Sequence, residues 1–484
     1  SKSFDSDTQL LFHALKENSF ELIKNQSGFY SFVFIKNLHK QCFSARDPFG
    51  KKPLYYYFDD DLLVIASEDR TIKDIASKYG KVVNVNATSV AHYLSYKDLH
   101  FGKTFYNGVF ELAPGSSLEF DFEKWTLYVS STWDNYYFSK PFYKQGKSKI
   151  TIGDTSQDLI PLLKQHVIST IDKRFNADVP VQLALSGGID STLLALVAQQ
   201  NKKTFERALT VSSSSRPTEQ IKSKLLCKKF CIVQNIIDFD VIDFLDILKK
   251  AIYAQAAPLS HPHALALFSL TKEASQKGKV LITGEGADEL MYGYEHYKNK
   301  KPTFAFLKHI NPNEYFDISG NDKTDTFINF KWEKFLKNND FRDLDVKTHL
   351  LSLLRRNDRV SMQNSVELRS AYLDFELFQF VTQQQENGYL LKGKHSLVEI
   401  IKEFFKNYKV DREKIGLYVP FDDWFEKRKN DDIIIKNYIS EAAAYMKMNF
   451  GWTLKKDLQV KGKLAWALLN IGVFLELENE KNDD

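Results

Sequence analysis

Short hydrophobic runs alternate with turn-forming residues in the first part of the chain. Between about residues 28 and 123 the runs FYSFVF, PLYYYF, LLVIAS and SSLEF are separated by DPFGKKP, DDD and APG. Runs of this length, rich in aromatic and aliphatic residues and bounded by Gly, Pro and Asp, are typical of β-strands. The composition turns polar over residues 141–155, and a helical period begins near Ser156. The pattern predicts a β-rich domain over residues 1–150 and a second domain over residues 151–484.

Hydrophobic runs and helical segments alternate in the second domain. The apolar runs Val179–Leu185, Ala208–Val211 and Lys279–Thr283 have amphipathic stretches between them, among them TLLALVAQQ directly after the first run. Strands that alternate with helices favour a parallel sheet with helices on both faces. From about Phe304 onward helical patterns such as HSLVEIIKEFF dominate. We therefore expect an α/β fold, with a parallel doubly wound domain and C-terminal helices after the β-rich domain.

The overall composition narrows the classes of function. Of the 484 residues 43% are hydrophobic and 26% are charged, which is ordinary for a globular protein of two or three domains. The 66 Lys and Arg and 62 Asp and Glu leave a formal net charge of +4, too small for a surface that binds a nucleic-acid backbone. Three cysteines are too few for a disulfide framework, and no leader is recognisable. The apolar stretch Leu464–Leu477 is interrupted by Asn470 and falls short of a membrane span. We expect a cytoplasmic protein with neither a nucleic-acid nor a membrane partner.

The segment Leu183–Ser191, LALSGGIDS, places two glycines between a buried strand and a helix. Glycines there allow a tight turn whose backbone N–H groups, with the helix N-terminus, can bind a phosphate. The segment is not a Walker loop, which requires a lysine in G-x-x-x-x-G-K-[ST]. An ordinary strand–turn–helix connection is the alternative interpretation, but Ser186, Asp190 and Ser191 around the glycines favour a phosphate loop.

A second loop follows the strand that begins at Val280, in VLITGEGADELMYGY. Ligands collect beyond the carboxyl ends of parallel strands, so this loop and the phosphate loop are expected to face one crevice. Glu285 and Asp288 suit proton transfer and metal binding. Helix capping is the alternative for acidic residues after a strand.

Taken together, these motifs resemble those of the glutamine-dependent asparagine synthetases. LALSGGIDS resembles the PP-loop of ATP pyrophosphatases, and TGEGADELMYGY resembles the signature that distinguishes the asparagine synthetases among them. LLRRNDRVSMQNSVELRSAYLD and DREKIGLYVPFDDW match two further runs of that family. In the first domain, SARDPFGKKPLYYY and VIASE resemble the attached glutaminase. The resemblance covers nearly the whole chain.

The resemblance implies ATP and Mg²⁺ as cofactors and assigns residues to the site. The phosphate loop would hold pyrophosphate, two aspartates would hold the metal, and residues at strand ends would line adenosine. These are Ser186, Gly187, Gly188 and Ser191 for pyrophosphate, Asp190 and Asp288 for Mg²⁺, and Leu185, Val211, Thr283 and Gly284 for adenosine. Glu285 would deprotonate ammonia, and Lys414 would stabilise charge on the phosphates. Asp358, Glu367 and Arg369 would organise the acceptor side of the cleft, with structural ion pairing as the alternative.

Two stretches of the synthetase domain depart from the family pattern. Ala371 replaces a proline, and Ala256 and Ala257 precede PLSHPHALAL where an acidic residue is often found. Because that stretch lies toward the acceptor pocket, the acceptor is not fixed by the resemblance. We interpret His261 and His263 there as polar lining of a pocket and not as a metal pair, because no third ligand is nearby.

The start of the chain departs further. The family's glutaminase uses an N-terminal cysteine, its own α-amine as base, an arginine-containing loop and an Asn-Gly oxyanion pair, and SKSFDSDT contains none of these. By resemblance Asp7 would hold the amino group of glutamine, and Cys42 cannot act as the nucleophile because it has no free α-amine beside it. We expect a partial glutamine amidotransferase-like domain and the use of free ammonia, unless a missing N-terminal segment carrying the cysteine completes the site.

Three hypotheses for function follow. The first is an AMP-forming carbon–nitrogen ligase that adenylates aspartate and transfers ammonia to give asparagine. The second applies the same chemistry to a uronic acid sugar or a natural-product carboxylate. The third is a non-catalytic scaffold, against which the intact Glu285, Lys414, Asp190 and Asp288 argue. A homodimer is compatible with all three.

Overall fold

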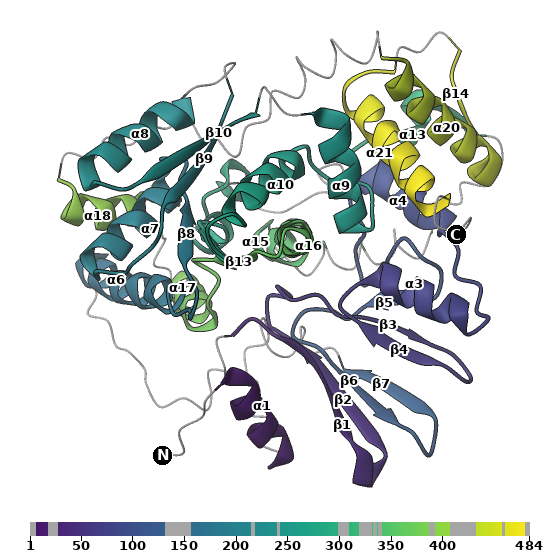
Figure 1. The fold of residues 1–484 in the computed structure, drawn as a ribbon, viewed down its shortest axis with the longest axis horizontal. Coiled ribbons are helices and arrows are strands. Elements are labelled where there is room, and N and C mark those ends of the chain that lie inside the picture. The colour runs from purple at the N-terminus through teal and green to yellow at the C-terminus, as the bar shows by residue number, and fades with distance from the viewer. Residues whose placement is uncertain are drawn as a thin grey trace.

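Figure 1 shows the computed structural model of the chain. It describes residues 6–17, 28–130, 156–213, 218–239, 243–298, 309–318, 332, 336, 341–386, 393–406, 432–456 and 460–479. The boundary expected near residue 150 lies outside these ranges, as does Lys414.

The first domain contains two antiparallel sheets. The four-stranded sheet has the order β1-β2-β6-β7 and the three-stranded sheet has the order β4-β3-β5. Their bounds are β1 Ser31–Lys36, β2 Gln41–Arg46, β3 Tyr55–Phe58, β4 Leu63–Ala66, β5 Val109–Glu111, β6 Ser117–Asp121 and β7 Thr126–Ser130, with a 3₁₀ turn η1 at Asn37–His39. Phe120 and Leu118 of β6 are buried with Cys42 of β2 and Leu54 in a core shared with residues of β3 and β4. The four hydrophobic runs noted in the sequence form β1, β3, β4 and β6, so the prediction of these strands is confirmed.

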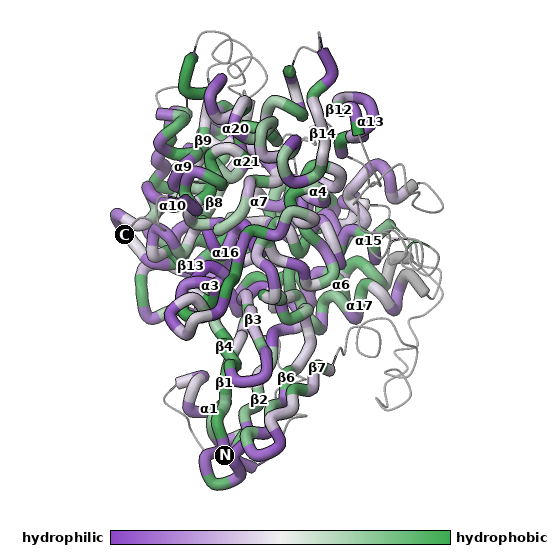
Figure 2. The backbone as a smooth tube through the Cα atoms, turned by 90° about the vertical axis from the view of Figure 1, so that its right-hand side faces the viewer, coloured by the Kyte–Doolittle hydropathy of each residue, from purple (hydrophilic) through white to green (hydrophobic). Residues whose placement is uncertain are grey.

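Three helices in this domain were not predicted. They are α1 Asp7–Lys16, α3 Asp69–Lys78 and α4 Ala87–Tyr96. In α3 the buried residues Ile72 and Ala76 lie one turn apart, whereas the rest of the helix is largely hydrophilic (Figure 2). In α4 the side chain of Asn86 accepts a hydrogen bond from Ser89 N at 3.1 Å and caps the helix.

The second domain is built on a five-stranded sheet with the order β10-β9-β8-β11-β13, in which every neighbouring pair is parallel. The strands are β8 Val181–Ala184, β9 Ala208–Ser212, β10 Gln234–Asp238, β11 Val280–Thr283 and β13 Glu367–Ser370. The chain passes from β8 outward to β10 and then returns to the other side of β8 with β11. The direction of winding therefore reverses between β8 and β11, and ligands bind at such a switch point in open α/β sheets.

Helices cover both faces of this sheet. Val280 and Ile282 of β11 pack into a core with α6, α7, α17 and α18, whereas Leu281 packs into the core formed with α9, α10 and α16. The helices are α6 Ser156–Lys173, α7 Ile189–Gln200, α8 Thr218–Phe230, α9 Phe244–Gln255, α10 His263–Ala274, α15 Phe341–Lys347, α16 His349–Gln363, α17 Phe375–Glu386 and α18 His395–Phe404. Alternate residues of a strand point to opposite faces, so this division confirms the predicted doubly wound fold.

Two long helices close the chain. The elements of this region are α20 Ile433–Phe450 and α21 Gly462–Asn479, with β12 Phe316–Ile318 paired to β14 Trp452–Leu454 and with the short elements α11 Ala287–Leu290, η4 Glu295–Lys298 and α13 Pro312–Tyr315. The apolar run Leu464–Leu477 lies in α21, where Asn470 is buried and its Oδ1 accepts a hydrogen bond from Leu259 N at 3.1 Å. Within the described ranges no helix has the length and apolar character needed to cross a membrane.

Buried charges join the first domain to α16. Arg355 Nη2 lies 2.6 Å from Glu111 Oε2, and Arg355 Nη1 lies 3.1 Å from Asp98 Oδ1. One turn later Arg359 Nη2 lies 2.8 Å from Asp69 Oδ1. A charged helix face and its counter-ions therefore hold the two domains together.

Candidate active site

The phosphate loop leaves β8 and enters α7 as its sequence predicted. Gly187 has a φ of +79°, and a Cβ atom there would lie 2.6 Å from Cβ of Lys222 on α8. Glycine is therefore required both by the backbone conformation and by the packing. Ser186 Oγ accepts a hydrogen bond from Gly188 N at 3.3 Å and lies 3.2 Å from Ser191 Oγ. The loop presents two hydroxyls and the N-terminus of a helix, a suitable set of donors for a phosphate.

The second loop packs directly against the phosphate loop. A Cβ atom at Gly284 would lie 2.9 Å from Cβ of Asp190, so only glycine permits this approach. Thr283, at the end of β11, donates a hydrogen bond from Oγ1 to Glu285 Oε2 at 2.7 Å. The structure thus brings together the two loops that were expected to share a crevice.

The two predicted metal ligands converge on one ammonium group. Lys394 Nζ lies 2.5 Å from Asp190 Oδ2 and 2.8 Å from Asp288 Oδ1, and the side chains of all three are largely buried. Burial alone would lower the pKa of Lys394, but the two carboxylates outweigh it and hold that pKa above its usual value. A pair of carboxylates that already share a cation fits a hard ion such as Mg²⁺, with water and phosphate oxygens as its other ligands. Among the residues that the structure describes, no group of three or more His, Cys, Asp or Glu side chains forms a metal site.

A lysine of the first domain reaches the second loop. Lys51 Nζ donates to Ser370 Oγ at 3.0 Å, and Ser370 Oγ donates to Glu285 Oε2 at 3.5 Å. Burial lowers the pKa of Lys51 to about 7, and the Glu285 carboxylate opposes this shift only in part. The ring of Phe29 lies 4.0 Å from the same Nζ atom. Glu285, the predicted base, is therefore linked through one hydroxyl to a buried lysine of the other domain.

The residues after β13 support the phosphate loop. Tyr372 Oη donates to the backbone oxygen of Asp190 at 2.8 Å. Ala371 N donates to the backbone oxygen of Thr283 at 2.8 Å, a bond that the proline expected from the resemblance could not make. The substitution that stood out in the sequence thus adds a hydrogen bond between β13 and β11.

Other predicted residues have structural partners. Asp358 Oδ1 lies 2.8 Å from Lys52 Nζ across the domain interface. Glu367 Oε1 lies 3.1 Å from Arg369 Nε, and Arg369 Nη1 also donates to the backbone oxygen of Asn176 at 2.7 Å. These contacts agree with the ion-pairing alternative, and the acceptor-side role of the three residues stays a prediction.

The structure gives the positions of three of the four remaining predicted site residues. Leu185 and Val211 are buried at the carboxyl ends of β8 and β9. Asp7 is exposed in the first turn of α1, where its Oδ1 accepts a hydrogen bond from Thr8 N at 2.7 Å. Lys414 lies outside the described residues. The roles of Leu185, Val211, Asp7 and Lys414 stay predictions.

Sequence reasoning missed Lys394 and Lys51. Lys394 directly precedes α18 in the run LLKGKHSLVEII. Lys51 lies in SARDPFGKKPLYYY, which was interpreted only as part of the glutaminase core. Neither run contains a pattern that shows which loop its lysine will contact. The position of each lysine directly after a glycine was the one feature of the sequence that could have drawn attention to it.

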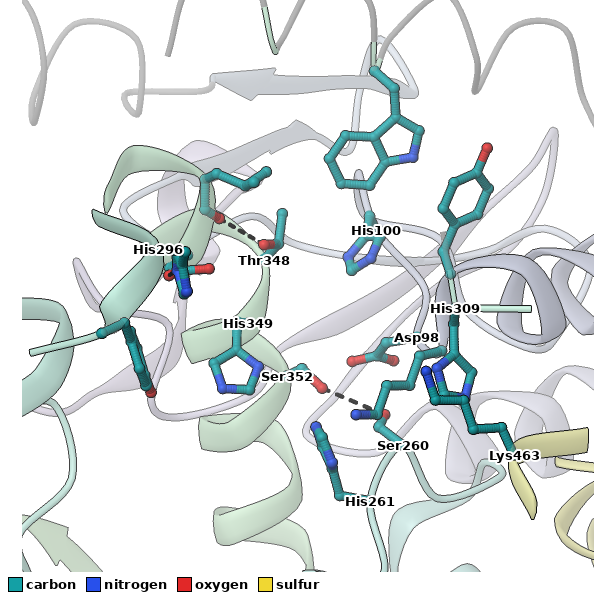
Figure 3. Close-up of a pocket in the computed structure, with 16 residues that line it drawn as sticks. Asp98, His100, Ser260, His261, His296, His309, Thr348, His349, Ser352 and Lys463 are labelled. Atoms are coloured by element: carbon teal, nitrogen blue, oxygen red, sulfur yellow. Dashed lines mark hydrogen bonds and ion pairs between the residues drawn. The ribbon is translucent and has the colours of Figure 1, made fainter. Parts of the chain in front are cut away.

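A cavity of about 350 Å³ opens beside the second loop (Figure 3). Tyr294 lines it and donates from Oη to Glu289 Oε1 at 2.8 Å. His261 also lines the cavity, and its ring stacks on that of His263 with centroids 5.7 Å apart. The predicted pocket-lining role of His261 agrees with this placement, whereas His263, for which the same role was expected, is not among the described residues that line this cavity.

Comparison with known proteins agrees with these motifs. Residues 162–447 match the family model for asparagine synthase, and residues 2–133 match the model for a glutamine amidotransferase domain. Asparagine synthetase [glutamine-hydrolyzing] 1 of Bacillus subtilis (strain 168) is 23% identical to 94% of this chain, which spans 77% of that protein. Amidase chry2 of Gibberella zeae is 26% identical over 61% of this chain and 44% of its own length. A solved NH3-dependent NAD synthetase from Campylobacter jejuni is 17% identical and covers 43% of this chain and 97% of its own, but its TM-score of 0.21 is too low to define a shared fold. The chain therefore belongs to the asparagine synthase family of carbon–nitrogen ligases and carries a glutamine amidotransferase domain.

Proposed function

We propose that the chain is an ATP-dependent ligase that adenylates a carboxylate and converts it to an amide with ammonia. One observation carries the proposal. The phosphate loop and the second loop pack together at the switch point of the sheet, where the side chain of Asp190 lies directly beside Gly284. A carboxylate is a poor target for ammonia because oxide would have to leave. Attack of the carboxylate on the α-phosphorus of ATP forms an acyl-adenylate and releases pyrophosphate. Ammonia then displaces AMP, and the amide and one proton are the remaining products.

The phosphate end of the site supports the first step. Ser186, Gly187, Gly188 and Ser191 would bind the departing pyrophosphate through hydroxyls and backbone N–H groups. Asp190 and Asp288 would hold Mg²⁺, which supplies positive charge to the phosphate oxygens. Lys394 would add its ammonium group to the same phosphates, and Lys414 remains a second candidate for this role.

The second step would depend on Glu285. Its carboxylate is held by Thr283 and Ser370 and would accept a proton from the attacking nitrogen. Because a glutamine amidotransferase domain is present, glutamine and free ammonia are the candidate nitrogen sources. Measuring glutamate release beside amide formation, with either nitrogen source supplied, distinguishes them.

The acceptor is left open by family membership. The relatives include proteins named as an asparagine synthetase and as an amidase. The resemblance favours aspartate, and a sugar or natural-product carboxylate is the second candidate. A non-catalytic scaffold is disfavoured because the two loops keep their glycines, hydroxyls and carboxylates in contact.

Exchange of labelled pyrophosphate into ATP with a panel of carboxylates tests the proposal. The wild-type chain should show exchange that depends on one class of carboxylate. Asp190→Asn should reduce this exchange about a hundredfold, because one preorganised charge is lost at the phosphates. Asp246→Asn, on the exposed start of α9, is the matched control and should leave exchange unchanged. Equal exchange in wild type and Asp190→Asn would contradict the assignment of this loop.

A further inference from the structure

The cavity beside the second loop lies where several distant parts of the chain meet. Its lining comes from the end of α4, from the segment before α10, from α15 and α16, and from the start of α21. Figure 3 shows His100, His261 and His349 pointing into the same space from different elements. A volume of about 350 Å³ exceeds what an amino acid of the size of aspartate fills and suits a small ligand with a ring.

The acidic side chains that line this cavity are in ion pairs, whereas its two lysines form no ion pair with a described residue. Asp98 is paired with Arg355 at 3.1 Å, and Asp345 is paired with His296 at 2.6 Å. Lys97 and Lys463 also line the cavity, and in the described part of the chain neither has a carboxylate within 4.0 Å. Burial and the neighbouring Lys463 lower the pKa of Lys97 to about 8, although Asp98 opposes this shift. Two lysines that line one cavity, neither of them in a salt bridge among the described residues, leave the cavity suited to an anion.

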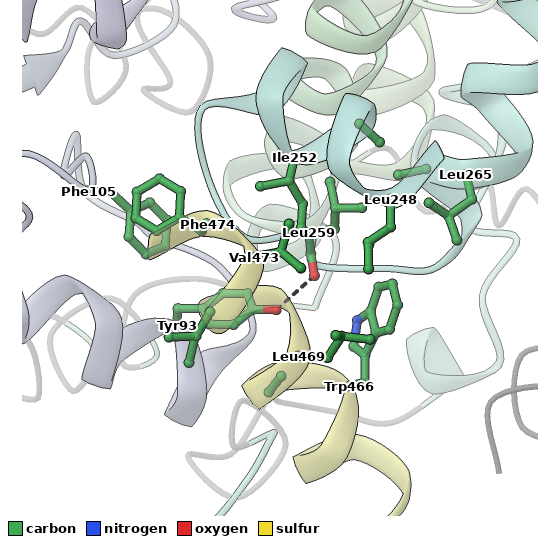
Figure 4. Packing of buried hydrophobic residues seen from close by; sticks show 14 of the residues in the cluster. Tyr93, Phe105, Leu248, Ile252, Leu259, Leu265, Trp466, Leu469, Val473 and Phe474 are labelled. Carbon is green, nitrogen blue, oxygen red and sulfur yellow. Dashed lines mark hydrogen bonds between the residues drawn. The ribbon is translucent and has the colours of Figure 1, made fainter. Parts of the chain in front are cut away.

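The helix that carries Lys463 is firmly held. Trp466, Leu469, Val473 and Phe474 of α21 pack against α9, Leu259 and Phe105 (Figure 4). Lys463 precedes Trp466 by less than one turn, so its backbone position is fixed although its side chain is exposed. Substituting Lys463 should therefore change the cavity without unfolding the helix.

The histidines supply neutral hydrogen-bonding groups. Burial and Arg355 lower the pKa of His100 to about 3, and burial with Lys97 and Lys463 lowers that of His309 to about 4. A neutral imidazole has one donor and one acceptor, which matches a hydroxyl group. It offers no negative charge to an ammonium group, and Asp98 and Asp345 are already paired. The lining thus suits hydroxyls and anions and does not suit the α-ammonium of an amino acid.

Arg356 connects the cavity to the reaction centre. It lies one turn after Ser352, which lines the cavity, and therefore on the same side of α16. Burial and the charge of Arg356 lower the pKa of His263 to about 4, and the Glu285 carboxylate attracts Arg356. Arg356 is therefore near enough to interact with both His263 and the predicted base. An acceptor could place its reacting carboxylate near Glu285 and its remaining groups in the cavity.

We propose that this cavity binds the body of the acceptor, and that the acceptor is a sugar acid with a second anionic group, a phosphate, held by Lys97 and Lys463. The inference rests on the proposed function. The reacting carboxylate must lie at the phosphate loop, so Lys97 and Lys463 would bind a different anionic group of the same acceptor. The histidines and Ser260 would bind the hydroxyls of the sugar, and aspartate would leave both lysines without a partner.

Pyrophosphate exchange with the full chain tests this assignment with D-glucuronic acid 1-phosphate, D-glucuronic acid and L-aspartate as probes. We expect the lowest KM with the phosphorylated probe. Lys463→Gln should raise that KM about tenfold or more, because one charge-assisted hydrogen bond is lost. The KM values for D-glucuronic acid 1-phosphate and D-glucuronic acid should therefore differ less in this variant than in the wild type. Lys78→Met, on the exposed end of α3, is the control and should change neither KM.

The outcomes separate the two claims. Exchange with aspartate as good as with the phosphorylated probe would overturn this inference while leaving the ligase in place. An unchanged KM for the phosphorylated probe in Lys463→Gln would also overturn it. Exchange with no carboxylate, although ATP binds, would refute the proposed function itself and this inference with it. Titration calorimetry of D-glucuronic acid 1-phosphate with the wild-type chain gives a second readout that does not require catalysis.

Discussion

Replacing Arg355 by methionine should weaken the attachment of α16 to the first domain. The guanidinium of Arg355 is shared between Glu111 and Asp98, and the exposed fractions of these side chains are 10%, 3% and 13%. Methionine keeps the apolar stem but leaves Asp98 without this ion pair and leaves Glu111 to Arg46, whose Nη1 lies 2.8 Å from Glu111 Oε1. Removing one partner of a buried ion pair costs about 3–5 kcal/mol. Because Arg46 remains, we expect a loss near the lower end, about 3 kcal/mol.

The pH dependence of this loss follows from Glu111. Burial alone would raise the pKa of Glu111, but Arg355 and Arg46 outweigh it and hold that pKa below its usual value. The unfolded chain therefore binds the proton more readily than the folded chain. The stabilisation is complete above the unfolded pKa and is lost as the pH falls through the folded pKa. The difference between wild type and Arg355→Met should accordingly stay constant above about pH 5 and shrink as the pH falls below about 4.

Urea denaturation of wild type, Arg355→Met, Glu111→Gln and the double variant measures the coupling. Since Arg355 and Glu111 are in contact, the free energies of the single variants should be non-additive by about 1–3 kcal/mol. Glu123→Gln breaks the surface pair with Lys40, whose side chains are 64% and 67% exposed, and should cost at most about 0.5 kcal/mol. A loss in Arg355→Met no larger than in this control, or additive free energies in the cycle, would refute the reasoning.

Three further variants test individual site residues. Lys394→Met should reduce pyrophosphate exchange about a hundredfold, because a charge beside the phosphates is removed, and exchange at the wild-type rate would exclude that role. Glu285→Gln should preserve exchange, which needs no base, while amide formation measured by product chromatography falls about a hundredfold; an equal fall in both would assign Glu285 another role. Lys51→Met should flatten the pH dependence of the free energy of unfolding between about pH 7 and pH 9. The pKa of Lys51 is about 7 in the folded protein, whereas the unfolded lysine keeps its proton to higher pH, so the wild-type protein becomes more stable as the pH rises through this range. Denaturation at the two pH values checks this, and parallel slopes in wild type and variant would contradict the burial of a lysine with a lowered pKa.

The sequence predicted those parts of the fold whose structure depends on neighbouring residues, such as turns that need glycine and strands with apolar runs. The strand–glycine–helix arrangement of LALSGGIDS could be predicted because Gly187 is required by the turn itself. The alternating apolar runs predicted the parallel sheet and hence the meeting of two loops at its edge. The helix α3 was overlooked within a segment dominated by strands, although the spacing of Ile72 and Ala76 contained its signal.

The missing parts of the site depend on contacts between distant segments. Lys394 meets Asp190 across 204 positions, and Lys51 meets Ser370 across 319. Hydrophobic periodicity reports only which face of one element is buried, so it cannot indicate which lysine will meet which carboxylate. The same limit applies to the cavity, whose lining is drawn from segments between Tyr96 and Lys463.

The hydrogen bond from Tyr372 to the backbone of Asp190 has a consequence for the order in which the protein matures during translation. The two residues are separated by 182 positions, and β13 completes the sheet only after the helices between β11 and β13 have been synthesised. A nascent chain whose residues up to α10 have left the ribosome contains the whole Ser186–Ser191 segment but none of the residues that brace it from the far side. Nucleotide binding should therefore appear late in synthesis, after residue 372 has emerged, and ribosome-bound fragments that end before β13 should be incapable of consuming ATP.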